Sequence, residues 1–457
     1  MMSVVSDRPR KSEGAGSTVK PNYIIILTDD HGYGDLGCMG ADDLRTPNLD
    51  RLAANGARFT DWYSNSPVCS PSRAALLTGR HPARTGIVDV LGGHRSEVGL
   101  SPEIPTLARA LKPLGYRTCL VGKWHLGVAE GYRPGDHGFD EWFGLLSGTI
   151  DYFSHIDYNL WPWDPAYYPV HDLWENDSEV WRNGRYMTEL ISEHAVEFLR
   201  RGEGVDEPFF LHVAYNAPHG PMHAPAEYVD RFPELTPARR IMAAMLSAMD
   251  DGVGSIVEEL ERQGVLENTC IIFMSDNGPS RHPANWLDGN LEPYYGASAG
   301  ELRGGKTSLF EGGLRSPSLM HWPAMIPAGQ LISEPIVAID VFPTLLVAAG
   351  GDPSDYDLDG LDILPVVTDG AETPHGDLFW EFRQQTAVRR GPWKLTLRPY
   401  ESDDNLSEHD VFLADLSNDV GETVNLRNVH PELTAELTAA ALAWREQVAP
   451  FYEEQDW

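Results

Sequence analysis

The chain has 457 residues, enough for a large buried core and for two domains. Hydrophobic residues make up 42% of it, and 13 residues are Trp, which favours a folded globular protein over a disordered one. Aspartate and glutamate outnumber lysine and arginine by 68 to 35, a net charge of −33. Such a surface repels nucleic acid and anionic membranes, so we expect neither as a partner. An anionic substrate would need a local cluster of basic groups, because salt screens distant charges beyond about 8 Å.

The N-terminal stretch is polar and charged, without the apolar segment of a secretion signal. No run of 18 apolar residues predicts a membrane-spanning helix. The four cysteines have no spacing typical of a metal site or a disulfide framework. We therefore expect a flexible tail over residues 1–20 and a cytoplasmic protein. If the start codon is mis-assigned, a secreted or periplasmic location is expected instead.

The first elements alternate between strand and helix. Residues 23–27 are apolar and β-branched, which predicts a buried strand that ends in a polar loop. Residues 46–53 show helical spacing, with Thr46 as a candidate cap and Pro47 in the first turn. Residues 58–63 predict a second strand, which leads to the stretch around Cys69.

The stretch from Ser66 to Arg73 places Cys69 next to a helix start. Pro71 suits the first helical position, and good helix formers follow it. The unpaired N–H groups of such a start attract anions, and Arg73 adds further donors for a tetrahedral oxyanion. The alternative is a buried cysteine that caps an ordinary helix.

The later elements continue the alternation and predict an α/β sheet with helices on both faces. Residues 152–181 are rich in Tyr, Trp, Pro and Asp without periodicity, which indicates a long excursion over the edge of the sheet. Beyond about residue 369 the pattern predicts a small antiparallel sheet with one helix. The expected helices are 106–112, 242–260 and, in the C-terminal part, 433–447; the expected strands are 117–121, 209–214 and 270–274 and, in the C-terminal part, 377–382, 385–389, 393–397 and 411–415.

Two predicted strands end in groups that can bind a cation. Asp29 and Asp30 follow the first strand, and Asp276 and Asn277 follow a later one. Ligand sites of open α/β sheets gather at the carboxyl ends of strands, and like charges there need a cation. Oxygen ligands suit Ca²⁺ or Mg²⁺, and six to eight of them favour Ca²⁺. A simple turn is the alternative for Asp276-Asn277-Gly278.

Three further motifs carry basic groups. Lys123 and His125 stand two residues apart after a predicted strand, so both can reach one anion. His219 follows the strand 209–214 and would reach the same edge of the sheet, and Lys306 lies in a glycine-rich segment. Solvent exposure is the alternative for either lysine. Glu311 and Arg315 have the pattern of a structural ion pair at a strand start.

These motifs resemble those of the type I, formylglycine-dependent sulfatases, and they follow one another along the chain in the same order as in that family. They are Cys69-Ser-Pro-Ser-Arg73 with Thr78-Gly79-Arg80, Asp29-Asp30, Gly122-Lys-Trp-His-Leu-Gly127, the segments around His219 and Lys306, and Asp276-Asn277. The resemblance implies an α/β fold, an alkaline-phosphatase-like sandwich with a central, mostly parallel sheet. The catalytic domain would span 21–370, and a C-terminal subdomain 371–457.

The family's chemistry implies roles for these residues. A formylglycine-generating enzyme would oxidise Cys69 to formylglycine, whose hydrate is the nucleophile, and Ca²⁺, or less favourably Mg²⁺, would bind beside it. The implied metal ligands are Asp29, Asp30, Asp276, Asn277 and the residue made from Cys69. The implied catalytic residues are Cys69, Arg73, Lys123, His125, His219 and Lys306, with His219 as the proton donor to the leaving oxygen.

The substrate is expected to be a small sulfate ester or a sulfated saccharide. Residues 132–144 and 149–155 resemble those of enzymes that act on sulfated sugars, including N-acetylgalactosamine sulfatases. Asp151 and His155 are candidate partners of sugar hydroxyls. Trp62, Trp161 and Trp163 either stack on a sugar ring or pack in the core. The alternative activity on the same fold and nucleophile is hydrolysis of phosphonate monoesters or phosphodiesters.

Overall fold

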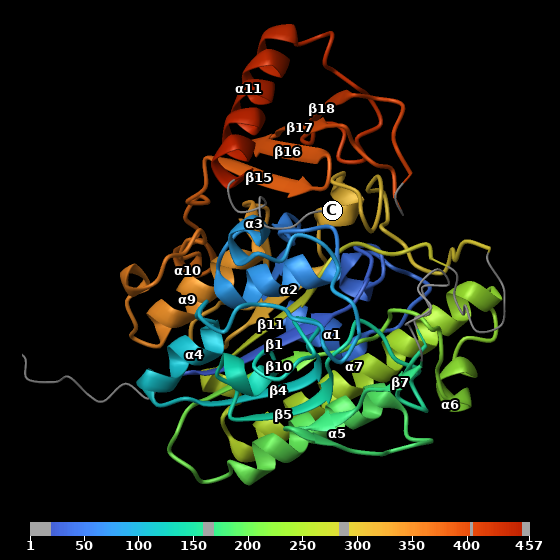
Figure 1. The fold of residues 1–457 in the computed structure, drawn as a ribbon, viewed down its shortest axis with the longest axis vertical. Helices are drawn as coiled ribbons and strands as arrows, with labels where there is room; N and C mark the ends of the chain where they lie inside the picture. The colour runs from blue at the N-terminus through green and yellow to red at the C-terminus, as the bar shows by residue number, and fades with distance from the viewer. Residues whose placement is uncertain (1–19, 159–168, 283–291, 403–404, 450–457) are drawn as a thin grey trace, which may run out of the picture.

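The computed structural model describes residues 20–158, 169–282, 292–402 and 405–449, so the predicted tail lies outside the described residues except for Lys20. A ten-stranded sheet in the order β13-β2-β12-β11-β1-β10-β4-β5-β8-β9 runs through the molecule (Figure 1). Its strands are β1 (Asn22–Thr28), β2 (Ala57–Phe59), β4 (Arg117–Lys123), β5 (Glu141–Leu145), β8 (Trp174–Glu175), β9 (Ser178–Glu179), β10 (Phe209–Ala214), β11 (Thr269–Ser275), β12 (Ser318–His321) and β13 (Gln330–Ile332).

The central strands β11, β1, β10, β4 and β5 are all parallel, as predicted. Their apolar sequences reflect burial on both faces of the sheet. Along β1, Ile24 and Ile26 point into one layer of the core, whereas Tyr23, Ile25 and Leu27 point into the other. Because the strands are parallel, their carboxyl ends meet at one edge of the sheet.

Helices cover both faces, which gives the predicted three-layer α/β sandwich. Helices α1, α5, α6 and α7 pack on the face of Ile24, and α2, α4, α9 and α10 on the face of Ile25. The described helices are α1 (Pro47–Ala54), α2 (Cys69–Thr78), α3 (Pro82–Thr85), α4 (Leu107–Leu111), α5 (Met187–Arg201), α6 (Ala226–Val229), α7 (Pro237–Gln263), α8 (Glu311–Leu314), α9 (Val341–Ala348), α10 (Leu364–Asp369) and α11 (Pro431–Val448). Short 3-10 helices are η1 (Gly37–Met39), η2 (Lys112–Leu114), η3 (Pro134–His137), η4 (Leu266–Asn268), η6 (Ala338–Asp340) and η7 (Pro353–Asp355).

Three local expectations need correction. The strand predicted over 58–63 is broken after β2, and β3 (Trp62–Tyr63) pairs instead with β14 (Ile336–Val337) in a separate sheet. Thr46 stands at the N-cap of α1, but its hydroxyl donates to the Asp50 side chain rather than accepting from the helix. The excursion after residue 151 contains short strands, β6 (Ile156–Asp157) paired with β7 (Val170–His171), besides β8 and β9.

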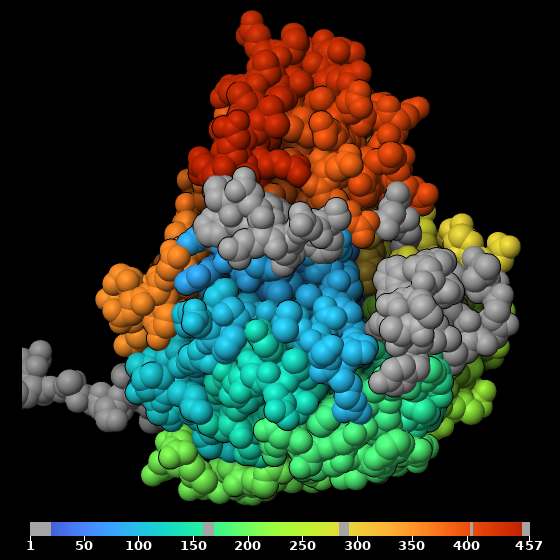
Figure 2. Space-filling model, viewed as in Figure 1, coloured from blue at the N-terminus to red at the C-terminus, as the bar shows by residue number. Residues whose placement is uncertain are grey.

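The C-terminal part forms the predicted small antiparallel sheet with one helix, at the top of Figures 1 and 2. Its strands, in spatial order, are β15 (Asp377–Phe382), β16 (Gln385–Arg390), β17 (Trp393–Leu397) and β18 (Val411–Asp415). Leu437 of α11 packs on one face of this sheet. On the other face, Leu378 and Trp380 share a buried cluster with Val68 and Ala75. The small sheet therefore packs directly against the segment that contains Cys69.

An ionic cluster at the centre of the contact between the two sheets involves the predicted pair. Arg315 lies 2.6 Å from Glu311, which confirms the ion pair, although the pair spans helix α8 and does not stand at the strand start that the sequence predicted. Lys394 of β17 lies 2.7 Å from the same carboxylate. Lys394 and Glu311 are fully buried. Within the described ranges, no helix combines the length and the apolar character that crossing a membrane requires.

Candidate active site

The carboxyl edge of the parallel strands brings the predicted site residues together. Asp29 and Asp30 follow β1, and Asp276 follows its neighbour β11. Lys123 is the last residue of β4, on the other side of β10. The Asp29 N–H donates to the carbonyl of Ala217, just after β10, at 3.2 Å. The strand ladder therefore continues into the loops and fixes where these side chains begin.

Cys69 lies at the N-terminus of α2, next to this edge. It is the first residue of the helix, so the expectation that Pro71 takes this position was wrong. Proline is tolerated within the first turn because its missing N–H has no partner there in any case. The thiol donates to Asp29 Oδ1 at 3.4 Å and accepts from Lys306 Nζ at 3.3 Å. Burial raises the pKa of Cys69 to about 12, so the unmodified thiol is protonated near neutral pH.

Three buried ion pairs surround Cys69. Lys123 Nζ donates to Asp29 Oδ2 at 2.6 Å, and Lys306 Nζ lies 2.8 Å from Asp30 Oδ1. Arg73 donates from Nε and Nη2 to Asp276 Oδ2 at 2.9 and 2.7 Å, a forked contact. Three cations and three carboxylates thus share a site that is almost closed to water.

The carboxylates respond differently to this surrounding charge. Burial acts against ionisation of Asp29, but Lys123, His219 and Arg73 hold the pKa of its carboxyl below the usual value. Burial and the Asp29 carboxylate raise the pKa of Asp276 to about 7, despite the nearby Arg73. A carboxylate that ionises this reluctantly indicates a site with room for additional positive charge.

The donor set fits a hard divalent cation. Ligand atoms of Asp29, Asp30, Cys69 and His219 lie within 4.8 Å of one another. Asn277 Nδ2 donates to Asp30 Oδ1 at 2.7 Å, and Asn277 Oδ1 is buried with no hydrogen-bond partner among the described residues. This orphaned oxygen points to a missing ligand, since buried polar atoms are nearly always satisfied. Carboxylate and amide oxygens are the ligands that Ca²⁺ and Mg²⁺ prefer.

His125 is fixed as a neutral imidazole. Its backbone is left-handed (φ 57°), and Nε2 donates to the Leu91 carbonyl at 2.9 Å. Burial, with Lys123 nearby, lowers the pKa of His125 well below its usual value. A Cβ at Gly148 would lie 2.7 Å from the ring, so only glycine fits beneath it. With its proton on Nε2, the ring offers a lone pair at Nδ1.

His219 occupies the more open side of the cluster. Its Nδ1 donates to the Gly220 carbonyl at 2.7 Å, and Nε2 lies 3.7 Å from Asp30 Oδ2. The Tyr152 hydroxyl lies 2.8 Å from the His219 carbonyl and ties the segment down. Burial lowers the pKa of His219, although Asp29 and Asp30 act in the opposite direction.

The predicted sugar contacts differ in their surroundings. Asp151 is partly exposed and lies 3.2 Å from His223 through Oδ2. It stands next to Tyr152, and therefore at the rim of the His219 segment. His155 is fully buried and donates from Nε2 to the Arg185 carbonyl at 3.1 Å, a geometry that does not favour contact with a sugar. Trp62 is fully buried in the core, while Trp161 and Trp163 lie outside the described residues.

Several supporting residues were not found from the sequence. Leu91 contributes a carbonyl to His125, and the Ser70 hydroxyl accepts from the Leu91 N–H at 3.1 Å. The Tyr152 hydroxyl holds the His219 segment. Leu91 acts through its main chain, and the other two act through contacts distant in the sequence, so no local pattern marks them.

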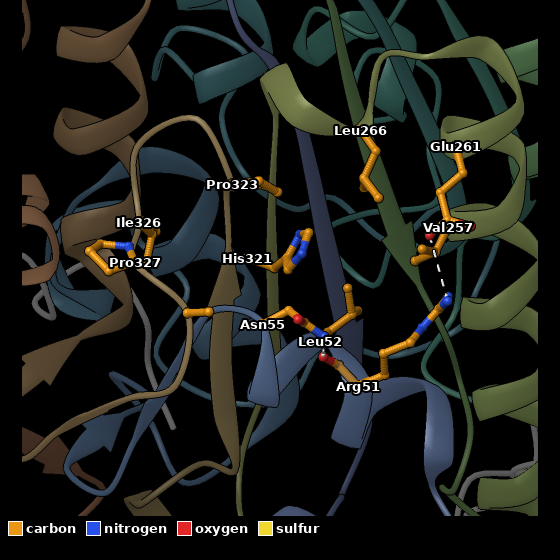
Figure 3. A pocket seen from close by; sticks show the side chains of 11 residues that line it. Arg51, Leu52, Asn55, Val257, Glu261, Leu266, His321, Pro323, Ile326 and Pro327 are labelled. Atoms are coloured by element: carbon orange, nitrogen blue, oxygen red, sulfur yellow. Dashed lines mark hydrogen bonds and ion pairs between the residues drawn. The ribbon is translucent and has the colours of Figure 1, made fainter.

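A separate hollow of about 500 Å³ opens near the start of β11, at the end of the strand opposite to Asp276 (Figure 3). Arg51 and Glu261 line it and already pair with each other at 3.5 Å. His321 also lines it, but its Nδ1 is shielded from solvent. None of the predicted site residues lies in this hollow.

Known proteins resemble the chain along most of its length. The family model described as Sulfatase matches residues 21–351. The N-acetylgalactosamine-6-sulfatase of Rattus norvegicus is 34% identical over 437 residues, which cover 92% of this chain and 79% of that protein. Arylsulfatase A of Homo sapiens is 35% identical over 447 residues, covering 89% and 83%.

A solved structure supports the same relationship. Ps i-CgsB, crystallised in complex with k-i-k-neocarrahexaose, superposes with a TM-score of 0.81 at 33% sequence identity. The superposition covers 93% of this chain and 92% of that one. The family model, the sequence relatives and the shared fold agree. The chain therefore belongs to the sulfatase family and is a sulfuric ester hydrolase with an alkaline-phosphatase-like fold.

Proposed function

We propose that this protein hydrolyses sulfate esters of carbohydrates, with a formylglycine made from Cys69 and a bound Ca²⁺. The observation that carries the proposal is the position of Cys69 at the start of α2, in contact with both Asp29 and Lys306. A helix N-terminus and buried basic groups together favour an anion at this point.

Conversion of Cys69 is supported by its sequence and by its environment. The segment from Cys69 to Arg73 has the form that a formylglycine-generating enzyme would recognise. The pKa of about 12 for the thiol makes an unmodified cysteine a poor nucleophile at neutral pH. The hydrated aldehyde would supply two hydroxyls, one to attack sulfur and one to release sulfate afterwards.

A divalent cation would be held by Asp29, Asp30, Asp276 and Asn277, with the residue made from Cys69. Its charge would offset the three carboxylates and favour ionisation of a hydroxyl beside it. The oxygen-only protein ligands suit Ca²⁺, with Mg²⁺ as the less favoured ion. The orphaned oxygen of Asn277 supports this assignment.

The basic side chains would bind and orient the sulfuryl group. Arg73, Lys123 and Lys306 carry N–H donors into one small volume, where negative charge builds up in the transition state. Neutral His125 would accept a proton at Nδ1. His219, on the more open side, would donate a proton from Nε2 to the departing alcohol.

A carbohydrate substrate is supported by the relatives. One is named an N-acetylgalactosamine-6-sulfatase, and a structural neighbour was crystallised with k-i-k-neocarrahexaose. A sugar alkoxide is a poor leaving group and needs a proton donor such as His219. Asp151 at the rim would accept a hydrogen bond from a sugar hydroxyl, whereas the burial of His155 argues against such a role for it.

A substrate panel tests the proposal. Enzyme co-expressed with a formylglycine-generating enzyme is assayed on sulfated monosaccharides, an aryl sulfate, the matching phosphate monoester and a phosphonate monoester. We expect the highest kcat/KM on a sulfated sugar and no turnover by the Cys69→Ala variant. Preference for the phosphonate would support the alternative hydrolase, and preference for the aryl sulfate would reject the carbohydrate assignment.

Two expectations from the sequence stay predictions. The cytoplasmic location is tested by fractionation of the native host. The boundary near residue 370, between a catalytic domain over 21–370 and a C-terminal subdomain over 371–457, is tested by limited proteolysis. Early cleavage there, with both fragments protected, is the expected result.

A further inference from the structure

The loop that carries Lys306 is bound by a side chain from the C-terminal sheet. Gln385, the first residue of β16, is fully buried. Its Nε2 donates to the carbonyl of Thr307 at 2.7 Å. Its Oε1 accepts from the N–H groups of Leu309 and Tyr400, at 3.1 and 2.9 Å. One carboxamide therefore satisfies three main-chain groups, two of them within three residues of Lys306.

Thr307 links this carboxamide to the catalytic segment. Its backbone is left-handed (φ 72°), a conformation that β-branched residues avoid unless their surroundings enforce it. Its N–H donates to the carbonyl of Pro67 at 3.0 Å, two residues before Cys69. The same residue is thus held on one side by the Cys69 segment and on the other by Gln385.

The position of Lys306 depends on this loop. The Lys306 N–H donates to the Pro279 carbonyl at 2.9 Å, and Nζ reaches both Asp30 and Cys69 Sγ. A loop that shifted by an ångström would move Nζ away from one of these partners. Small displacements of this kind are costly, because catalysis depends on the alignment of the reacting groups.

We propose that Gln385 is a positioning residue for Lys306, so that the C-terminal sheet helps to build the sulfuryl-binding site. The inference rests on the proposed function, in which Lys306 binds the sulfuryl group. It assigns to the small sheet a role in catalysis that acts through the loop of Lys306.

A double-mutant cycle tests this coupling. Gln385→Met keeps the size of the side chain and removes all three hydrogen bonds, whereas Gln385→Glu keeps the acceptors and removes the donor to Thr307. Each is combined with Lys306→Ala. Gln384→Met is the matched control, because Gln384 is exposed in the adjacent hairpin turn. We measure kcat/KM on a sulfate ester and the thermal midpoint for every variant.

In the parent enzyme, we expect Gln385→Met to lower kcat/KM about 10- to 100-fold. In the Lys306→Ala background, the same substitution should lower kcat/KM less than about twofold, because the residue that it positions is already lost. The control should match the parent. Equal losses in both backgrounds, or no loss at all, would overturn the inference. If Gln385→Met does not fold, Gln385→Glu carries the same comparison. If Lys306→Ala leaves kcat/KM unchanged, the proposed role of Lys306 is rejected. This outcome differs from one in which Lys306 matters but Gln385 acts independently of it.

Discussion

Replacement of His219 by alanine separates proton donation from sulfate binding. The side chain of His219 is 18% exposed, whereas those of Arg73, Lys123 and Lys306 are 8% exposed or less. His219 is therefore the most accessible of these four side chains, as the proposed role of proton donor to the leaving alcohol requires. Because Nδ1–H is committed to the Gly220 carbonyl, His219 can give a proton only from Nε2, and only when its ring is the imidazolium.

The size of the effect should depend on the leaving group. A general acid contributes about 100- to 10,000-fold when the leaving group is a strong base. We expect His219→Ala to lower kcat/KM about 100- to 1,000-fold on a sugar sulfate, and less than about tenfold on an aryl sulfate. A phenolate departs without much protonation, which explains the difference.

The assay compares kcat/KM on one sugar sulfate and one aryl sulfate, with Lys306→Ala measured alongside. In the proposed mechanism Lys306 would donate to the sulfuryl group whichever alcohol leaves, so its loss should cost about 100- to 1,000-fold on both substrates. Equal losses for His219→Ala on both substrates would refute the assignment and leave His219 as another sulfuryl ligand.

Three further predictions concern the metal and stability. Asp276→Ala should lower calcium occupancy by elemental analysis and abolish most turnover; full activity after exhaustive chelation would contradict this. Glu311→Gln leaves Lys394 and Arg315 short of a charged partner, so urea denaturation should show a loss of about 3–5 kcal/mol; a loss below about 1 kcal/mol would contradict it. Burial raises the pKa of Glu422 to about 7 from 4.5, so the folded protein holds a proton that the unfolded chain has lost. Stability should fall between pH 5 and 7, and Glu422→Gln should flatten the fall in thermal midpoint.

The parallel core of the fold was predictable from local sequence. The strand at residues 23–27 is apolar along its whole length, and the strand at 209–214 is apolar except for His212, as expected for strands that are covered on both faces. The break after β2 was not predicted, because Thr60 suits a strand and a single aspartate, Asp61, does not by itself mark where a strand ends. The Asp61 carboxylate is instead committed to Arg315 and Arg389, and both contacts are distant in the sequence.

Four charged members of the site could be predicted because each stands at the end of a strand, namely Asp29, Asp30, Lys123 and Asp276, whereas Arg73 within α2 and Lys306 in a loop were predicted from the motifs that resemble the family's. Asp29 and Lys123, for example, follow apolar runs whose length fixes where they emerge. The residues that orient these charged side chains could not be predicted from the sequence. Gln385 lies 79 positions from Lys306 and acts through main-chain atoms of the loop, which leave no pattern in the sequence. The burial of His155, which argues against a sugar contact, also becomes visible only in the fold.

The central claim is tested most directly by mass spectrometry of the peptide that contains Cys69. The protein is produced with and without a co-expressed formylglycine-generating enzyme, and the fraction of lighter, aldehyde-reactive peptide is compared with turnover of a sulfate ester. We predict that kcat per total enzyme rises in proportion to that fraction and vanishes in Cys69→Ala. Full turnover by protein whose Cys69 remains an intact thiol would contradict the account.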